Sequence, residues 1–448
     1  MTENQLTEQH NARTLLRFAA PTIIMTLFMS LYTMVDGIFV ANFISADALA
    51  GLNLVIPALS LLVALSVLIS SGGSVVISRK LGEMRVTEAR QDLSCIVLLT
   101  CLSGAVMTAL ALVFADPILR TGLGVTNILY PYALDYYRTL MAFAIPCLLQ
   151  VQFQYLFVTA GAPALGLLCV AAGGISNIVL DYVLIVLCQL HIRGAALATG
   201  IGYSIPAAAG LIWFACNRRG ALYFTTPRFR LCTLRESAVN GAAGMIINLA
   251  GAAVTWFYNR IIILYLGETG VSAATIVLYA RFMFNSLPSG YASGVAPVIS
   301  FNFGRRDFGR VKLLFHISMR AVLMGSVLIF AASTLLRGQI TSLFASDNIQ
   351  LASLAQRRIL LFSISYLCSG VNIFAAAFFS ALNRGKLSAA IMFMNVFVFL
   401  IGAMLLLPKL GLGADGVWLA VPAAELLSLL MTVLLLRRTT QDIWQHAE

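Results

Sequence analysis

The chain has 448 residues, of which 60% are hydrophobic and only 10% are charged, and its mean hydropathy is +0.91. Soluble domains carry about 25% charged residues, so this composition excludes an ordinary water-soluble fold. The formal net charge of +11 would suit a nucleic-acid partner, but the positions of the basic residues, described below, favour a role in membrane topology instead.

Long uncharged runs predict helices that cross a membrane. The longest, residues 48–78, has 31 residues without Asp, Glu, Lys or Arg. A helix needs about 20 apolar residues to span the hydrocarbon core, and barrel strands are far shorter than these runs. We therefore predict an all-α membrane protein with twelve transmembrane helices, at residues 14–42, 48–78, 92–115, 132–160, 163–189, 194–217, 235–266, 271–303, 310–336, 352–382, 387–408 and 414–436.

The basic residues are distributed unevenly between the two sides of these helices. Of the 29 Lys and Arg residues, 19 lie on the side of the N-terminus, 7 lie on the opposite side, and Arg260, Arg281 and Arg320 lie within helices. Cytoplasmic loops carry an excess of Lys and Arg. We therefore expect a multi-pass protein of the cell inner membrane with both termini in the cytoplasm, and no nucleic-acid partner.

An internal repeat with an offset of 222 residues divides the chain into two halves. Each half has six helices, so both enter the membrane from the same side, which predicts two six-helix lobes related by a parallel pseudo-two-fold repeat, as in secondary transporters. The expected parts are an N-lobe at residues 1–217, a cytoplasmic linker at 218–234 and a C-lobe at 235–448. The recurring residues are Ser71, Gly72, Val76, Ile77, Ser78 and Gly82, matched by Ser293, Gly294, Val298, Ile299, Ser300 and Gly304, and Gly194, Leu197 and Ala198, matched by Gly416, Leu419 and Ala420.

Two acidic residues lie at one depth in the predicted N-lobe. Asp36 and Asp181 each follow the inner end of their helix by 18 residues, or about 27 Å. Asn177 lies one turn before Asp181, and Thr199 falls near the same level. Ionisable groups within a membrane are costly and suggest function, so we interpret these four residues as an ion-coupling cluster that takes up a proton or a sodium ion. A purely structural role for the acids is the alternative.

The repeat predicts that the C-terminal half has no equivalent cluster. At the offset of 222, Asp36 corresponds to Tyr258, Asn177 to Phe399 and Asp181 to Ala403.

Glu425 is the remaining acid within a predicted helix. It can meet a cationic substrate, form an ion pair with Arg281 or Arg320, or hold a helix break beside Pro422. Our candidate residues for a substrate cavity are Glu425, Tyr32, Tyr258 and Met283.

Several motifs are absent from the sequence. It has no G-x-x-x-x-G-K-[ST], no H-E-x-x-H and no G-x-S-x-G, so we expect no ATP-driven pump and no enzyme, and an ion gradient as the energy source. The eight cysteines are scattered without a C-x-x-C pair, so we expect no disulfide framework, no resident metal site and no cofactor.

Six short segments of the chain carry a recognisable pattern. They read SLYTMVDGIFV at residues 30–40, VVISRKLGEMR at 75–85, TAGAP at 159–163, NIVLD at 177–181, GAALAT at 194–199 and FNFGRRD at 301–307. They extend over essentially the whole chain and include both halves of the repeat. Together these segments resemble the multidrug and toxic compound extrusion (MATE) family, in its bacterial MepA-like or DinF-like branch.

The resemblance implies a secondary active antiporter that exports lipophilic organic cations in exchange for protons or sodium by alternating access. By position, Asp36 is similar to the coupling aspartate of the branch, and Asn177, Asp181 and Thr199 are similar to its partners; a sodium ion would lie at Asp36, Asp181 and Asn177. In helix 4 the sequence departs from the family, because Gln154, Tyr155 and Val158 occupy the stretch that is usually polar and basic.

The expected partners are cationic small molecules and membrane lipids, and we expect the protein to act as a monomer. Two alternatives stay open. The first is a flippase for a lipid-linked saccharide or lipid, which would need more basic residues in its cavity to hold phosphate. The second is a membrane protein that transports nothing.

Overall fold

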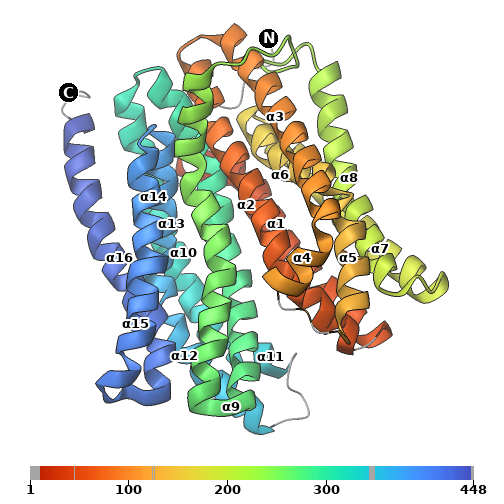
Figure 1. Ribbon diagram of the computed structural model, residues 1–448. Coiled ribbons are helices and arrows are strands. Elements are labelled where there is room, and N and C mark those ends of the chain that lie inside the picture. The colour runs from red at the N-terminus through yellow and green to blue at the C-terminus, as the bar shows by residue number, and fades with distance from the viewer. Residues whose placement is uncertain (1–10, 45, 124, 126, 343–348, 445–448) are drawn as a thin grey trace.

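The structure is a computed structural model that describes residues 11–44, 46–123, 125, 127–342 and 349–444 (Figure 1). Within the helices, some side chains lie outside the described part, among them those of Asp36 and Tyr258. The described residues form helices and connecting loops, without a strand. In Figure 1 the helices of the N-terminal half and those of the C-terminal half form two bundles side by side, so the predicted all-α fold of two lobes is confirmed.

Six spans make up the N-lobe. Two of them are composite: α5 and α6 form one bent span, and α7 continues into the π-helical turn η3. The elements are α1 (Ala12–Phe43), α2 (Ala46–Gly82), α3 (Val86–Val113), α4 (Ala115–Pro117), η2 (Ile118–Gly122), α5 (Tyr130–Met141), α6 (Ala144–Thr159), α7 (Pro163–Asp181), η3 (Tyr182–Leu187) and α8 (His191–Cys216).

The C-lobe begins after a stretch, residues 217–230, that has no helix or strand. Its elements are α9 (Leu231–Gly304), α10 (Phe308–Leu335), α11 (Arg337–Ser342), α12 (Ile349–Ser363), α13 (Tyr366–Ala381), α14 (Gly385–Phe393), η4 (Met394–Leu400), α15 (Ile401–Leu406), η5 (Pro408–Leu412) and α16 (Gly413–Trp444).

Helix α9 contains two spans and folds back on itself. A straight helix of its 74 residues would extend for about 110 Å. Yet its beginning, at Ser237 and Gly241, packs against Gly72 of α2, and its end, at Phe301, packs against Gly82 of the same helix. Both ends of α9 therefore lie at one end of the molecule, as expected for the predicted helices at 235–266 and 271–303.

The other spans bring the total to the predicted twelve. Among the described residues, seven helical stretches are long and apolar enough to cross a membrane, and nine if each of two bent pairs is one span. One of the seven, Gly385–Gln441, reverses direction where Gly411 and Gly413 have φ values of 91° and 50°, a conformation that glycine adopts without steric cost. Counting this stretch as two spans, and adding the two spans of α9, gives twelve.

Two of the twelve predicted spans are bent. The span of α5 and α6 bends by 57° just before Pro146, which lacks an N–H and crowds the carbonyl of Ala142. The span of α12 and α13 bends by 50° without a proline at the break. There Ser363 donates a 2.7 Å hydrogen bond to the carbonyl of Ile359, a local bond that bends helices.

The lobes are packed most closely at one end of the molecule, which we call the basic end. It is the end at which α1 begins, α2 ends and α9 both begins and ends, and it carries Arg79 and Lys80. A Cβ at Gly72 would collide with the carbonyl oxygen of Ser237, so the backbones of α2 and α9 touch there. Close contacts of α1 with α9 also lie in the first half of α1, where Thr26 donates a 2.9 Å hydrogen bond to the carbonyl of Ser286.

Charged side chains reinforce this junction. Arg79 of α2 donates two hydrogen bonds of 2.5 and 2.9 Å to Glu236 of α9. Lys80 forms a buried ion pair with Asp92 of α3 and donates a 3.2 Å hydrogen bond to Thr233 of α9. These contacts hold the N-lobe, the linker and the start of α9 together. Truncating one partner of the buried pair would be costly, because the other charge would be left uncompensated.

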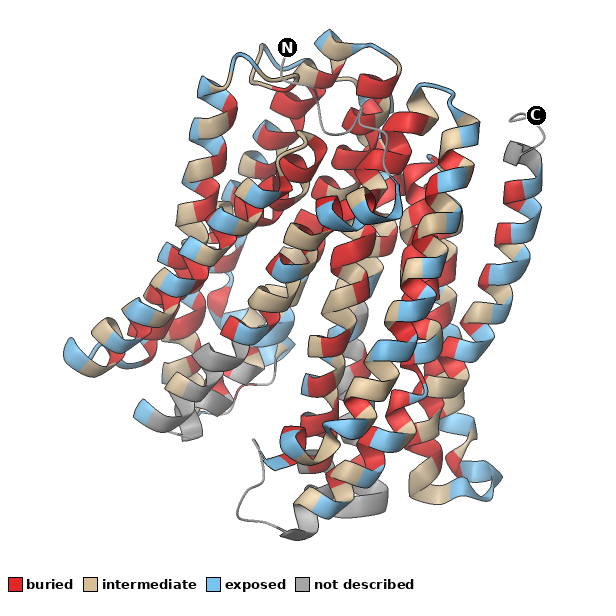
Figure 2. Ribbon diagram, turned by 180° about the vertical axis from the view of Figure 1, so that it is seen from behind, coloured by how far each residue is buried: buried red, intermediate tan, exposed pale blue. Residues whose placement is uncertain are grey.

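The outer surface of the bundle is apolar. On α3, for example, Leu98, Leu102, Val106 and Leu110 are between 38% and 56% exposed. Figure 2 shows exposed residues along the outer sides of the helices, which are the sides that meet lipid in a membrane. Such a surface is expected where lipid, not water, surrounds the protein.

Replacing Gly72 by alanine should weaken the junction of α2 and α9, because the new Cβ would meet a carbonyl oxygen. We expect a loss of about 1–3 kcal/mol in unfolding free energy, measured by thermal or denaturant unfolding of the purified protein in detergent. The control is Gly325→Ala in α10, where nothing lies within 4 Å of the new Cβ and where alanine should stabilise the helix by about 0.5–1 kcal/mol. Equal stability of the two variants would contradict this packing.

Candidate functional site

A small enclosed cavity lies inside the N-lobe, between α1, α6, α7 and α8. Its volume is about 10 Å³, close to the minimum that holds one water molecule. The lining combines aromatic, amide and hydroxyl side chains with glycine backbone, from residues Tyr32, Gln150, Val170, Gly173, Gly174, Asn177, Thr199, Gly202 and Tyr203. Two of the four predicted coupling residues, Asn177 and Thr199, therefore line one cavity.

Glycines make this gathering possible. A Cβ at Gly173 of α7 would collide with the carbonyl oxygen of Gly202 of α8, and one at Gly174 would collide with the rings of Phe28 and Tyr32 of α1. Small residues allow helices in a membrane to approach closely. The side chains of α1 and α8 can therefore reach those of α7.

Two of the predicted coupling residues bond to each other. The amide of Asn177 donates a 3.3 Å hydrogen bond to the hydroxyl of Thr199. Asn177 is 2% exposed, and among the described residues its Oδ1 atom has no hydrogen-bond partner. A buried carbonyl oxygen of this kind is costly unless it finds a partner, so the site can accept a water molecule, a proton donor or a cation.

Asp181 is completely buried at the last residue of α7, one turn beyond Asn177. The π-helical turn η3 starts at the next residue, Tyr182, and such turns are frequent at functional sites. The side chain of Asp36 lies outside the described residues. The predicted pairing of Asp36 with Asp181 thus stays a prediction.

Sequence reasoning missed two polar residues of this cavity, Gln150 of α6 and Tyr203 of α8. In the same span, the family's pattern had pointed to Gln154, which lies one turn after Gln150 on α6. Gln150 is only 5% exposed, and a glutamine in an apolar span was the signal that could have identified it.

The C-lobe has a polar cluster of its own around Glu425 of α16. Asn372 of α13 donates hydrogen bonds from Nδ2 to the Oε2 atom of Glu425, at 2.8 Å, and to its backbone carbonyl, at 3.0 Å. Asn395 of η4 donates a third, of 3.1 Å, to the same Oε2. This cluster lies at other positions of the repeat than Asp36, Asn177 and Asp181, so it is not the equivalent of the predicted N-lobe cluster.

The predicted ion pairs of Glu425 do not form. Among the described residues no basic nitrogen pairs with its carboxylate; the guanidinium of Arg281 lies 5.8 Å from the ring centre of Phe362, and Arg320 is exposed on α10. The candidate substrate residues are also spread over both lobes, because Tyr32 lines the N-lobe cavity and Met283 packs against the core of the C-lobe. The side chain of Tyr258 lies outside the described part.

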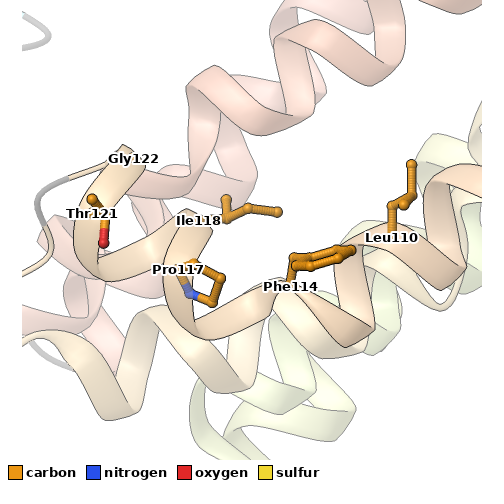
Figure 3. Close-up of a pocket in the computed structure, with 6 residues that line it drawn as sticks. All are labelled: Leu110, Phe114, Pro117, Ile118, Thr121 and Gly122. Carbon is orange, nitrogen blue, oxygen red and sulfur yellow. The ribbon is translucent and has the colours of Figure 1, made fainter.

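A larger recess, of about 550 Å³, lies where α3 meets α4 and η2 (Figure 3). Figure 3 shows that Leu110, Phe114, Pro117 and Ile118 line it, with Thr121 as the only polar side chain among the six labelled residues. All come from one short stretch of the chain on the outer surface. We interpret this recess as a surface that faces lipid, and not as part of the polar site.

Comparison with known proteins identifies relatives for the whole chain. The MatE family matches it twice, over residues 21–183 and 242–405, and the two matches end 222 residues apart, which is the offset of the internal repeat. A Multidrug export protein MepA from Staphylococcus aureus (strain bovine RF122 / ET3-1) is 24% identical over 96% of this chain and 95% of its own length. A FAD transporter from Shewanella oneidensis is also 24% identical, over 93% of this chain and 92% of its own length.

Solved structures share the fold. An outward-facing conformation of a multidrug resistance MATE family transporter of the MOP superfamily superimposes with a TM-score of 0.93 over 99% of both chains, at 20% identity. A MOP superfamily transporter from Pyrococcus furiosus, described as having a binding pocket of reverse polarity, superimposes with a TM-score of 0.91 over 99% of both chains, also at 20% identity.

Replacing Thr199 by valine should destabilise the N-lobe, because the amide of Asn177 would lose its hydrogen-bond partner with little change of volume. We expect a loss of about 1–3 kcal/mol in unfolding free energy, measured by denaturant titration of the purified protein. The control is Thr121→Val, at an exposed threonine of the outer recess, where we expect no loss. A Thr199→Val variant as stable as this control would argue against the hydrogen bond.

Proposed function

The chain belongs to the MatE family, the MATE transporters, and on that premise we propose that it is a secondary active antiporter that exports lipophilic organic cations in exchange for protons or sodium. The observation that carries the proposal is the pairing of two lobes, joined at the basic end, with buried polar sites inside the lobes. Rocking of one lobe against the other can then expose a central path first to one side and then to the other.

We infer that the basic end faces the cytoplasm. Lys and Arg are concentrated in cytoplasmic loops, and Arg79, Lys80, Arg85 and the linker lie at this end. With both termini there, the inner membrane of a bacterium is the expected location, and the protein acts as a monomer. Lobes that are joined at the cytoplasmic end correspond to the outward-facing state of an alternating-access cycle.

Coupling is proposed to reside in the N-lobe cavity. A cation that binds at Asp36 and Asp181, with oxygens of Asn177 and Thr199 nearby, would change the packing of α1 against α7. If substrate binds best when this site is empty, the two ligands compete, and the linkage drives export. The charge-bearing groups are carboxylates, which suit a proton or a hard cation such as sodium.

The choice of substrate class follows from the names of relatives and from the charges. One relative is named a multidrug export protein and another a FAD transporter. Phosphate-bearing substrates need several basic side chains. Of the three arginines within the predicted helices, Arg320 is exposed on the outer helix α10 and Arg281 lies near the ring of Phe362, while the side chain of Arg260 lies outside the described residues. A lipophilic cation therefore fits better than a lipid-linked saccharide or a dinucleotide.

Purified protein in proteoliposomes should export ethidium when a proton gradient or a sodium gradient is imposed, and the gradient that drives export identifies the coupling ion. Asp36→Asn and Asp181→Asn should each abolish gradient-driven export, because neither variant can exchange charge with the ion. Fluorescence of entrapped dye measures the rate, and size-exclusion chromatography checks folding. Transport of a flavin dinucleotide but not of ethidium would reject the proposed substrate class.

Alternating access also predicts that a cross-link between α2 and α9 at the basic end stops transport. In a background without the eight native cysteines, Arg79→Cys with Glu236→Cys should be joined by a short bifunctional maleimide, and export should fall at least tenfold. The control pair is Arg90→Cys with Tyr223→Cys, because these residues join the linker to α3, within one moving unit. Full export after cross-linking of the first pair would contradict the rocking of the lobes.

A further inference from the structure

The last part of α16 has a row of exposed apolar side chains that ends at an arginine. Leu427, Leu430 and Leu434, which we call the apolar row, are 45%, 57% and 62% exposed, and Arg438 is exposed one turn later. Because these four residues are spaced by three or four positions, they lie on one face of the helix. In Figure 1, α16 is the outermost helix of the C-lobe, so this face meets the surroundings of the bundle.

The length of the apolar row corresponds to one leaflet of a membrane. Residues 426–436 contain no charged side chain, and a helical stretch of this length extends for about 16 Å. Half of a hydrocarbon core of about 30 Å is about 15 Å. Placed against the acyl chains of one leaflet, the apolar row puts Arg437 and Arg438 at the level of the phospholipid headgroups.

More basic groups lie beside the end of α16. The guanidinium of Arg384, in the turn between α13 and α14, donates a 3.3 Å hydrogen bond to the hydroxyl of Thr439, and Lys386 is exposed two residues further on. That hydrogen bond keeps the turn next to Arg437 and Arg438. Two separate segments thus bring four basic side chains, which we call the basic edge, to one side of the C-lobe.

The basic edge has no compensating carboxylate among the described residues. In the N-lobe and the linker, by contrast, carboxylates form ion pairs with Arg79, Lys80, Arg85 and Arg230. Within the described ranges, none of the four side chains of the basic edge lies within ion-pair distance of an acid. Asp442 follows Arg438 by one turn, and its side chain lies outside the described part. The basic edge therefore carries an excess of positive charge next to an apolar surface.

We propose that the basic edge and the apolar row together bind one anionic phospholipid. Guanidinium groups hold phosphate oxygens through charge-assisted hydrogen bonds, and the apolar row lies against the acyl chains. A soluble phosphate compound or an acidic protein would use only the charges, whereas a phospholipid uses both surfaces. The cytoplasmic leaflet, which carries anionic lipids, meets the basic end in the orientation inferred above.

The bound lipid has a consequence for the C-lobe. Its headgroup joins the end of α16 to the turn between α13 and α14, two segments that Arg384 and Thr439 connect with a single side-chain hydrogen bond. A ligand that contacts both segments in the folded state stabilises their packing. This inference goes beyond the transport function, because it depends neither on the substrate nor on the coupling ion.

Thermal unfolding of the purified full-length protein in mixed micelles tests the site without transport. Rising fractions of phosphatidylglycerol should raise the unfolding temperature, because this lipid binds the folded state, and phosphatidylcholine, which has no net charge, should raise it far less. In Arg437→Gln with Arg438→Gln, the fraction of phosphatidylglycerol that gives half of the effect should rise about thirtyfold, or about fivefold for each basic residue lost. An unchanged fraction would overturn the proposal.

The control pair is Arg219→Gln with Arg228→Gln, because both arginines are exposed in the linker and their loss changes the net charge equally. This pair should respond to phosphatidylglycerol as the wild type does. Equal weakening in the two double variants would indicate a general attraction between charges and would refute the site. Stabilisation of the wild type by phosphatidylcholine or by glycerol phosphate, to the same extent as by phosphatidylglycerol, would also refute it.

A second measurement locates the lipid on the wild-type protein, so it holds even if a variant does not fold. Phosphatidylglycerol with a photoreactive group in its acyl chain should label residues 427–434 of α16, identified by peptide mass spectrometry, and unlabelled phosphatidylglycerol should compete. The outer side of α3, where Leu98 and Leu102 are also exposed, is the reference for chance contacts with lipid. Labelling of α16 that does not exceed that of α3, or that shows no competition, would contradict the proposal.

Discussion

The packing of α2 against α9 at the basic end is the contact on which the arrangement of the lobes depends. At Gly72 and Gly82 the two backbones touch without intervening side chains, and the ion pair of Arg79 with Glu236 lies at the same place. Dispersion between closely packed helices is the main source of association in lipid, because apolar side chains gain nothing there by leaving water. A junction of glycines and charges is strong enough to hold the lobes and still limited to one end, so the rest of each lobe stays free to move as a unit.

Polar side chains in the bundle follow a second constraint, that each needs a partner which lipid cannot supply. In the N-lobe, glycines bring α1, α7 and α8 so close that Asn177 reaches Thr199. In the C-lobe, a π-helical turn places Asn395 beside Glu425. Both solutions concentrate costly groups between helices at corresponding levels of the repeat, and both leave buried oxygens without a described partner, at Asn177 and at Asn372. A buried oxygen without a hydrogen-bond partner costs about 1–3 kcal/mol of stability.

The internal repeat explains why the two sites correspond, Glu425 to Tyr203 and Asn372 to Gln150 at the offset of 222, and why they differ. The MatE family matches each half of the chain over nearly the same length, so the halves share a backbone plan in which the fourth, fifth and sixth helices of a lobe meet. That plan fixes where a polar site can form without fixing which helix carries the acid. In the N-lobe the described acid buried in the middle of the bundle is Asp181, on α7. In the C-lobe it is Glu425, on α16. One backbone arrangement can therefore carry different chemistry in its two copies.

The sequence alone determined the fold class, the number of spans and the repeat, because uncharged runs, charge asymmetry and recurring residues are properties of the chain that do not depend on contacts. It also singled out Asn177, Thr199 and Asp181, since polar residues in apolar spans are rare enough to be noticed. Only the tertiary structure decided which of the polar residues meet. Gln150 and Tyr203 joined the N-lobe cavity, and Asn372 and Asn395 joined Glu425, because helix rotation, the bend before Pro146 and the π-helical turn at η4 set the direction of each side chain. Those features arise from packing between segments far apart in the sequence, and a pattern read along one helix cannot contain them.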